Sequence, residues 1–325
     1  MDALPQLGRG IFEVLEPTLA AYEQLLLSRE TEIKSTRRDT HQYGPDPRQT
    51  LDIYYPHNGA AAATVLSKAA KAVLVFCYGG GFVQGDKTRP SYANDLVFAN
   101  VGHYFASRHG FTVVVPDYRL MSHGARFPSG GEDVGLVVDW IKTSLAKQQG
   151  YGSIDLFFMG NSVGGVHVST WALHPAFADS VKGVTAAARE GPGVLLRGLL
   201  LLGVPMHFGG DDNEILRNYF GAGEIRKNSP LGLLESAKQR GDGPNLPGVR
   251  VALLLSELDP EYIFDSAKEF QEAWPESAGI ETQMLKGHNH ISPHCSLGTG
   301  VEKEEAWGIQ VAEFCQVVRL DNEKR

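Results

Sequence analysis

The chain has 325 residues, of which 42% are hydrophobic and 21% are charged, and its formal net charge is −8. This composition excludes the disordered and fibrous classes, and a chain of this length can bury a large core. The acidic balance argues against proteins that bind nucleic acid or anionic lipid through a basic surface.

The cysteines and the apolar runs indicate the cellular location of the protein. Its three cysteines, Cys77, Cys295 and Cys315, are too sparse for a disulfide framework, and reduced thiols are typical of cytosolic proteins. The N-terminal stretch lacks the basic and apolar regions of a signal peptide. The most apolar run, 194–204, is too short to span a bilayer. We therefore expect a cytoplasmic protein without a membrane span.

The first elements in chain order are a helix and a hairpin. Within residues 11–28, apolar side chains recur every three or four residues, which predicts an amphipathic helix. Alternating residues near 32–43 and 50–55, separated by the turn-rich sequence GPDPRQ, predict an antiparallel hairpin.

From residue 72 onward, short apolar runs alternate with helical stretches. Continuous apolar runs predict strands that are buried on both faces, as in a parallel sheet. The alternation of strands and helices predicts an α/β layered fold. The predicted strands are 72–78, 111–118, 155–160, 197–204, 249–256 and 281–285. The predicted helices are 92–108, 130–147, 163–172, 262–273 and 302–318.

Residues 160–164, GNSVG, have the G-x-S-x-G pattern of a nucleophile elbow. They follow a predicted strand and precede a predicted helix, which is the context that such an elbow requires. The small residues allow a sharp turn that lifts the hydroxyl of Ser162 above the edge of the sheet. The alternative is a tight strand–helix connection without a chemical role.

Three glycines follow the strand at 72–78, in the sequence YGGGF. Glycines let backbone N–H groups turn toward a ligand, and acyl transfer needs such donors at its developing oxyanion. A phosphate-binding loop is the alternative, but Lys-Ser or Lys-Thr does not follow the last glycine.

A carboxylate and a histidine follow the last two predicted strands. Asp259 comes just after the strand at 249–256, and the carboxyl ends of parallel strands are where sites assemble. An ordinary helix N-cap is the alternative role for Asp259, and Glu257 is a competing carboxylate. His290 follows the next strand, so the chain order is Ser, Asp, His, as in α/β-hydrolases.

A metal site is the competing interpretation of the region around His290. His288, His290, His294 and Cys295 are all possible ligands. The sequence offers no second cluster of ligands, and a metal site would leave Ser162 unexplained. We therefore predict neither a metal nor an organic cofactor.

Together these segments resemble the hormone-sensitive-lipase-like carboxylesterase branch of the α/β-hydrolase superfamily, from about residue 51 to residue 314. YGGG at 78–81 is similar to the H-G-G-G motif of the family, and DYRL at 117–120 is similar to its D-Y-R-L segment. FPSGGED at 127–133 resembles the F-P-x-x-x-E-D motif, and DPE at 259–261 resembles D-P-L. Tyr78 departs from the family because a histidine usually stands there and orients the glycine loop.

The resemblance implies a site and a fold. It implies a triad of Ser162, Asp259 and His290, and an oxyanion hole made by the N–H groups of Gly80, Gly81 and Val163. It also implies a single α/β-hydrolase domain over residues 1–325, with a mostly parallel central sheet flanked by helices. Small helical cap elements are expected at about 1–30 and 205–245.

The stretch at 205–245 interrupts the alternation and is rich in Gly, Asn and aromatic residues. A loop-rich stretch of this length is usually functional. We expect a substrate pocket with apolar walls, although its aromatic residues could instead only pack the cap onto the core. The candidate pocket residues are Tyr78, Phe82, Met206, Phe208, Tyr219 and Phe220.

The predicted function is hydrolysis of a carboxylic ester of an uncharged small molecule, through an acyl-enzyme intermediate and without nucleic acid as a partner. Two alternatives share the same motifs. One is an amidase, formamidase or lactone hydrolase that uses the same triad. The other is a ligand-binding protein with the same fold and no turnover.

Overall fold

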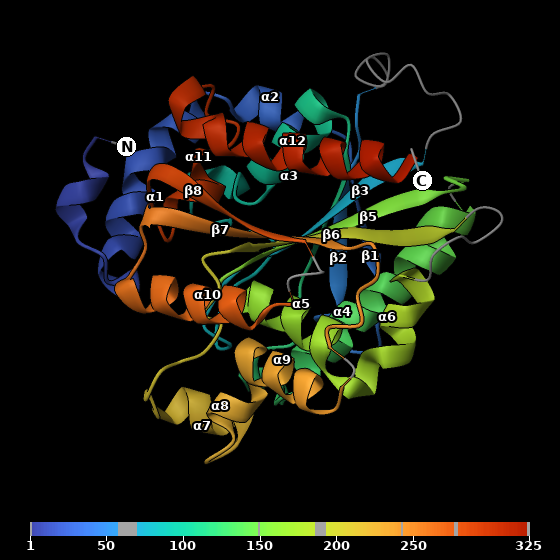
Figure 1. Cartoon of the computed structure of the whole chain (residues 1–325). Coiled ribbons are helices and arrows are strands. Elements are labelled where there is room, and N and C mark those ends of the chain that lie inside the picture. Colours follow the sequence, from blue (N-terminus) through green and yellow to red (C-terminus); the bar gives the residue numbers. More distant parts are fainter. Residues whose placement is uncertain are drawn as a thin grey trace.

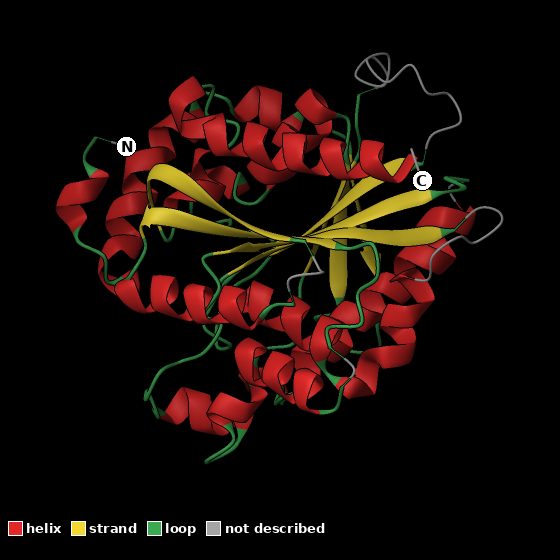
Figure 2. Ribbon diagram, viewed as in Figure 1, coloured by secondary structure: helices red, strands yellow, loops and turns green. Residues whose placement is uncertain are grey.

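A computed structural model gives the fold and describes residues 2–57, 70–148, 150–185, 193–241, 243–275 and 279–323. In this part of the chain, eight strands form one sheet, with helices on both faces (Figure 1 and Figure 2). The strands are β1 (Arg38–Gln42), β2 (Thr50–Tyr54), β3 (Lys71–Cys77), β4 (Thr112–Pro116), β5 (Ile154–Asn161), β6 (Val194–Leu202), β7 (Arg250–Leu258) and β8 (Ile280–Asn289).

The sheet has the order β1-β2-β4-β3-β5-β6-β7-β8. Strands β4, β3, β5, β6, β7 and β8 are paired in parallel, whereas β1 and β2 are antiparallel to their neighbours. Every residue of β4 and β5 is buried, as expected for apolar strands covered by helices on both faces. The predicted mostly parallel sheet flanked by helices is therefore confirmed.

The helices form two layers (Figure 1). One layer contains α2 (Glu30–Lys34), α3 (Ala99–His109), α11 (Ser292–Ser296) and α12 (Glu302–Glu323), and α1 (Ile11–Leu27) lies beside α11. The other contains α4 (Ser129–Trp140), α5 (Val163–Leu173), α6 (Ala178–Thr185), α9 (Pro230–Gln239) and α10 (Glu261–Ala273). Helices α7 (Glu214–Phe220) and α8 (Ile225–Asn228) lie beyond α9. A π-helical segment, η5 (Ile141–Gln148), continues α4, and the short 3₁₀ turns are η1 (Leu4–Leu7), η3 (Ala93–Asp95), η4 (Met121–His123) and η6 (Pro175–Phe177).

The core lies on both sides of the sheet. Along β3, Val73 and Val75 belong to the buried cluster on one face, whereas Leu74 and Phe76 belong to the cluster on the other face. This alternation follows from the two-residue period of a strand. Burial on both faces holds the sheet rigid beneath its edge loops.

The structure corrects one predicted element and adds another. The segment predicted as extended from residue 32 begins with helix α2, and β1 starts only at Arg38. The stretch at 205–245, where small helical elements are expected, contains α7, α8 and α9. Helix α6 was not predicted. The missed short helices are stabilised by tertiary packing of a few apolar side chains, such as Val181 and Val184 in α6, which a periodicity test over longer windows does not detect.

The register of the sheet brings the ends of the central strands to one edge. Cys77 of β3 pairs with Gly160 of β5, which pairs with Leu201 of β6. At the other side of β6, Leu202 pairs with Leu254 of β7. The loops that follow β3, β5, β6, β7 and β8 therefore leave the sheet at the same edge, where sites of open α/β sheets assemble.

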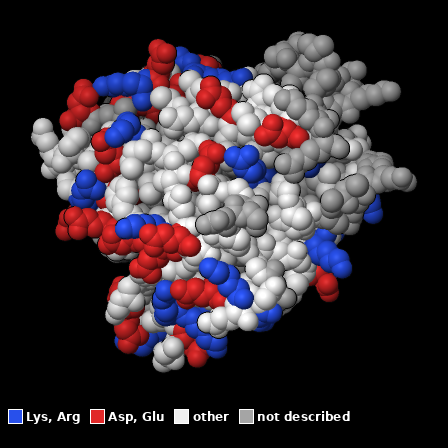
Figure 3. Space-filling model, viewed as in Figure 1, with Lys and Arg blue, Asp and Glu red and all other residues white. Residues whose placement is uncertain are grey.

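The surface carries charges of both signs. Figure 3 shows acidic and basic side chains interspersed over the lower left of the visible face. Arg226 of α8 lies 3.0 Å from Glu235 of α9 and 3.7 Å from Glu269 of α10, and these exposed ion pairs connect α8 to that helix layer at little net energy. Among the helices of the described residues, none has the length and apolar character needed to cross a membrane.

Candidate active site

Ser162 sits at a strained turn between β5 and α5. Its φ is 51° and its ψ is −124°, a backbone conformation that residues other than glycine rarely adopt. The turn is fixed by the backbone: the N–H of Ser162 donates to Leu202 O (2.8 Å), and its carbonyl accepts from Gly165 N (2.9 Å) and Val166 N (3.2 Å). Strain of this kind persists only where the surroundings enforce it, and it is typical of functional sites.

Glycines let the elbow pack against its neighbours. A Cβ atom on Gly164 would lie 2.1 Å from Cys77 O and 2.4 Å from Tyr78 O, so only glycine allows α5 to approach the end of β3. A Cβ atom on Gly79 would lie 3.1 Å from Cβ of Ser162. The glycine loop is therefore in contact with the elbow that carries Ser162.

The structure places Asp259 and His290 together. Nδ1 of His290 lies 2.7 Å from Oδ1 of Asp259, and both side chains are buried. The second carboxylate oxygen, Oδ2, accepts from Ser256 N at 2.8 Å. Nε2 of His290 is buried and has no hydrogen-bond partner among the described residues.

Gly203 connects this pair to the elbow. Its φ is +55°, and a Cβ atom here would lie 3.1 Å from Nδ1 of His290 and 3.5 Å from Oδ1 of Asp259. Gly203 directly follows Leu202, whose carbonyl accepts from the N–H of Ser162. The segment 202–203 thus contacts both the nucleophile turn and the histidine–aspartate pair.

The competing carboxylate, Glu257, is used differently. Its Oε2 accepts from Gly287 N at 2.7 Å, and Oε1 lies 3.4 Å from Nζ of Lys286. These donors lower the pKa of Glu257 below its usual value. Glu257 therefore ties β7 to β8, while Asp259 is the carboxylate that contacts the histidine.

The other histidines of this region do not converge on a common point. Nδ1 of His288 lies 2.9 Å from Ser292 Oγ, and the ring of His294 packs against Phe98 with 5.2 Å between centroids. Burial lowers the pKa of His288 to about 4 and the pKa of His294 to about 3, so both are neutral near pH 7. Within the described residues, no group of three His, Cys, Asp or Glu side chains is arranged to hold a metal ion.

The backbone N–H groups of Gly80, Gly81 and Val163 donate to no other group in the described part of the chain. The loop turns sharply, with a φ of 152° at Gly80, 61° at Gly81 and 70° at Phe82. Val83 N and Gln84 N donate to Gly80 O and close the turn at 3.3 and 3.0 Å. The three predicted oxyanion donors are therefore free to bind a ligand.

Tyr78, which stands where the motif has histidine, is completely buried beneath the glycine loop. Its ring stacks on Phe98 at 5.2 Å and on Tyr118 at 4.9 Å, and its hydroxyl donates to Asp117 Oδ1 at 2.5 Å. Burial raises the pKa of Tyr78 well above its usual value, so the phenol stays protonated as a donor. Arg48 completes the network with a bond to the Tyr78 hydroxyl (3.2 Å) and one to Gly85 O. Tyr78 thus supports the loop from below, while its role as a pocket residue stays a prediction.

The other predicted pocket residues lie close together. Phe82 stacks on Tyr219 with 4.1 Å between centroids, and its ring edge meets Phe220 at 5.4 Å. Phe208 lies 5.3 Å from Phe220 and is only partly buried. Met206 belongs to the same buried cluster. We call Phe82, Phe208, Tyr219 and Phe220 the aromatic cluster; it joins the glycine loop to α7.

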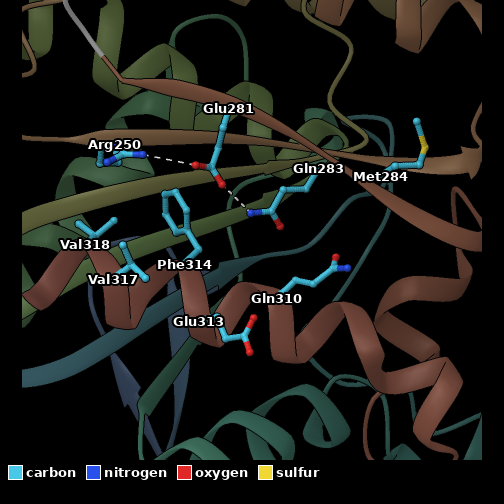
Figure 4. Close-up of a pocket in the computed structure, with 9 residues that line it drawn as sticks. All are labelled: Arg250, Glu281, Gln283, Met284, Gln310, Glu313, Phe314, Val317 and Val318. Carbon is cyan, nitrogen blue, oxygen red and sulfur yellow. Dashed lines mark hydrogen bonds and ion pairs between the residues drawn. The ribbon is translucent and has the colours of Figure 1, made fainter.

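A groove lies elsewhere on the protein. It has a volume of about 430 Å³ and is situated between β8, at the edge of the sheet, and α12 (Figure 4). In Figure 4, Glu281 links Arg250 to Gln283 along the strands, while Phe314 and Val317 project from the helix. None of the predicted site residues lines this groove, so it is separate from the candidate active site.

Two contacting residues were not predicted from the sequence. Gly203 could have been found, because a glycine at the end of a buried apolar run often marks a close approach. Arg48 gives no local signal, since it lies in a turn and reaches the glycine loop only through the fold. The predicted site residues all lie at the same edge of the sheet, on loops or at the start of α5: Ser162, Asp259, His290, Gly80, Gly81 and Val163.

Comparison with known proteins is consistent with this architecture. The sequence model of the family described as BD-FAE matches residues 51–187, which include the glycine loop and the elbow. The fold is similar to that of esterase B from Lactobacillus rhamnosis (HN001), with a TM-score of 0.63 and 15% identity over 95% of this chain and 96% of that chain.

Two further solved structures share the fold. Carboxyl esterase 2 from the mycorrhizal fungus Tuber melanosporum gives a TM-score of 0.54 at 18% identity, over 94% of this chain and 99% of that chain. The hyperthermophilic esterase from Pyrobaculum calidifontis gives a TM-score of 0.54 at 17% identity, over 92% of this chain and 93% of that chain. The sheet order, the elbow after β5 and these likenesses agree, and they show that the chain has the α/β-hydrolase fold.

Proposed function

We propose that this protein is a serine hydrolase that cleaves a carboxylic ester of an uncharged small molecule. The observation that carries the proposal is the buried contact between His290 and Asp259, which the segment 202–203 joins to the strained elbow of Ser162. Esters are supported further by the solved structures of the same fold, which include esterase B with a tributyrin phosphonate inhibitor.

In the proposed mechanism, Nε2 of His290 takes the proton of the Ser162 hydroxyl while Oγ attacks the ester carbonyl. Asp259 orients the imidazole through Nδ1 and stabilises its charged form. The N–H groups of Gly80, Gly81 and Val163 donate to the oxyanion of the tetrahedral intermediate.

His290 then gives its proton to the departing alcohol, which leaves an acyl group on Ser162. Water, deprotonated by the same imidazole, attacks the acyl-enzyme and releases the acid. Nucleophile, base and oxyanion donors all come from the chain itself, so the proposed reaction needs no metal or organic cofactor.

The aromatic cluster supports an uncharged substrate. Three of its four side chains are phenylalanines, and Phe82 directly follows the glycine loop that would hold the carbonyl oxygen. We further propose that 1–30 and 205–245 act as cap elements over a single catalytic domain. Three buried cysteines without disulfide partners support a cytoplasmic location.

Turnover of a short-chain aryl ester tests the proposal. We expect hydrolysis that follows saturation kinetics and stops when a serine-directed phosphonate labels Ser162. A pure protein that binds the ester without releasing acid would support the ligand-binding alternative. Faster turnover of a matched amide or lactone would reassign the substrate on the same triad.

A further inference from the structure

The N-terminal segment between Leu4 and Tyr22 contacts both loops that carry the proposed base and acid. In Figure 1, α1 lies beside α11, at the end of the sheet where β7 and β8 finish. Leu4 and Tyr22 share a buried cluster with Ile291, the residue that directly follows His290. The segment is remote in sequence, so these contacts exist only in the folded chain.

Arg9 contacts the loop of the acid. Its Nη1 donates to Asp259 O at 2.7 Å and to Glu257 O at 3.1 Å, across 250 and 248 residues of sequence. Two hydrogen bonds close the same loop on its other side. The N–H of Asp259 donates to Ser256 O at 2.9 Å, and the N–H of Ser256 donates to Oδ2 of Asp259 at 2.8 Å. The guanidinium group therefore bridges the two carbonyls that flank the turn presenting Asp259.

Thr18 contacts the loop of the base. Its Oγ1 accepts from Nδ2 of Asn289 at 2.8 Å, in a buried position. The other end of the same amide, Oδ1 of Asn289, accepts from Ile291 N at 3.0 Å and from Ser292 N at 2.9 Å. Thr18 thereby fixes the orientation of the amide that shapes the turn around His290.

We infer that Arg9 and Thr18 are positioning residues, which hold the acid loop and the base loop in the register that brings His290 onto Asp259. The inference rests on the proposed function for its effect on turnover. Neither side chain touches the reacting atoms. Each acts through the backbone or amide of the loop that it binds.

Catalytic geometry is sensitive to small displacements, and a shift of about 1 Å can cost on the order of 100-fold in rate. Loss of either contact should therefore lower kcat and leave KM nearly unchanged, because the aromatic cluster and the glycine loop are untouched. A contact that served only stability would lower the melting temperature without changing kcat below it.

Matched variants separate the two roles. Arg9→Met keeps the aliphatic stem and removes the donors, and Arg9→Lys restores a cation. Thr18→Val keeps the shape and removes the acceptor. The controls are Arg37→Met, which removes an exposed ion pair with Asp39, and Thr185→Val, which removes a buried hydroxyl that donates to Val181 O at 3.0 Å. Both controls lie away from the two loops.

We expect kcat to fall about 10- to 100-fold in Arg9→Met and in Thr18→Val at constant KM, measured well below each melting temperature. Arg9→Lys should recover part of the loss, and both controls should keep the kcat of the unaltered protein. A kcat within twofold of that value in Arg9→Met and Thr18→Val would overturn the inference, as would an equal loss in the controls.

A readout that does not depend on turnover keeps this test distinct from the test of the proposed function. The proton between Nδ1 of His290 and Asp259 should give a far-downfield NMR signal that is absent from His290→Gln. We expect Arg9→Met and Thr18→Val to shift or broaden this signal and the controls to preserve it. If the protein hydrolyses no ester, the proposed function fails, while an unchanged signal in both variants refutes the positioning role itself.

Discussion

The nucleophile turn and the base–acid loops of this protein are held in place by different means. Ser162 is fixed by backbone hydrogen bonds and by close packing at Gly164 of α5 and Gly79 of the glycine loop, so its position follows from the packing of strands and helix around it. His290 and Asp259 lie on loops whose shape depends on side chains from far away in the sequence, such as Arg9 and Thr18. The difference indicates that the proposed nucleophile is preorganised by the fold, whereas the proposed base and acid are positioned by added contacts.

The strongest test of the first region is Ser162→Ala. We expect kcat for an aryl ester to fall by about 10⁴-fold or more, because a triad nucleophile has no substitute. The melting temperature should stay the same or rise, since alanine bears the same backbone strain without a hydroxyl. Steady-state kinetics and calorimetry measure both. Turnover near that of the unaltered protein would place the nucleophile elsewhere.

The second region is tested by two histidines that are neighbours in sequence. His290→Gln should reduce kcat by an amount similar to the loss in the serine variant, because members of a triad act as a unit. His288→Gln should retain most of the activity, since His288 contacts Ser292 and stays neutral. An active His290→Gln together with an inactive His288→Gln would exchange the two assignments.

The same difference explains what could be predicted from the sequence. The elbow is a local feature, so G-x-S-x-G between an apolar strand and a helix was sufficient to locate Ser162. Asp259 and His290 could be predicted to lie close together because each follows a predicted strand, and these strands end at one sheet edge. The roles of Arg9 and Tyr78 were harder to predict. Arg9 contacts a residue 250 positions away in the sequence, and Tyr78 acts from beneath the glycine loop, so neither role leaves a local sequence pattern.

Gly203 lies at the boundary between the two regions, and we expect its substitution to lower kcat less than the triad substitutions do. In Gly203→Ala, the new Cβ atom lies 3.1 Å from the His290 ring, and the positive φ costs about 1–2 kcal/mol. Gly209 also has a positive φ, but its Cβ position faces open space, so Gly209→Ala is a matched control. Both variants should lose similar stability in denaturant titrations, and only Gly203→Ala should lose kcat, by roughly tenfold. Equal kcat in both would show that the histidine adjusts freely.

The aromatic cluster extends the comparison to specificity. Phe208→Ala and Phe220→Ala should change the ranking of acyl esters by kcat/KM, with up to about 1–3 kcal/mol for each pocket contact. The activity on the smallest ester should change least, because the triad is not altered. Kinetics on a series of esters of increasing acyl length measure the effect. A constant ranking with a lower melting temperature would mean that the cluster only packs α7 onto the core.

The smallest predicted effect concerns pH and involves one buried histidine from each region. Burial lowers the pKa of His167 on α5 and of His294 on α11 to about 3. In the unfolded chain both histidines titrate near their ordinary value of about 6.5. Between these values the unfolded state binds protons that the folded state does not, so the free energy of unfolding falls as the pH falls. Each histidine contributes a slope of at most about 1.4 kcal/mol per pH unit.

Chemical denaturation between pH 7 and pH 5 measures this slope. His167→Gln and His294→Gln should each reduce it by a similar amount, even where they also change stability at pH 7. His123→Gln, at an exposed position, is the control and should leave the slope unchanged. If only one of the buried variants reduces the slope, the other histidine accepts a proton in the folded state, and the local structure of its region must open at acidic pH. Because α11 follows the base loop and α5 follows the elbow, that result would identify which of the two regions is less rigid.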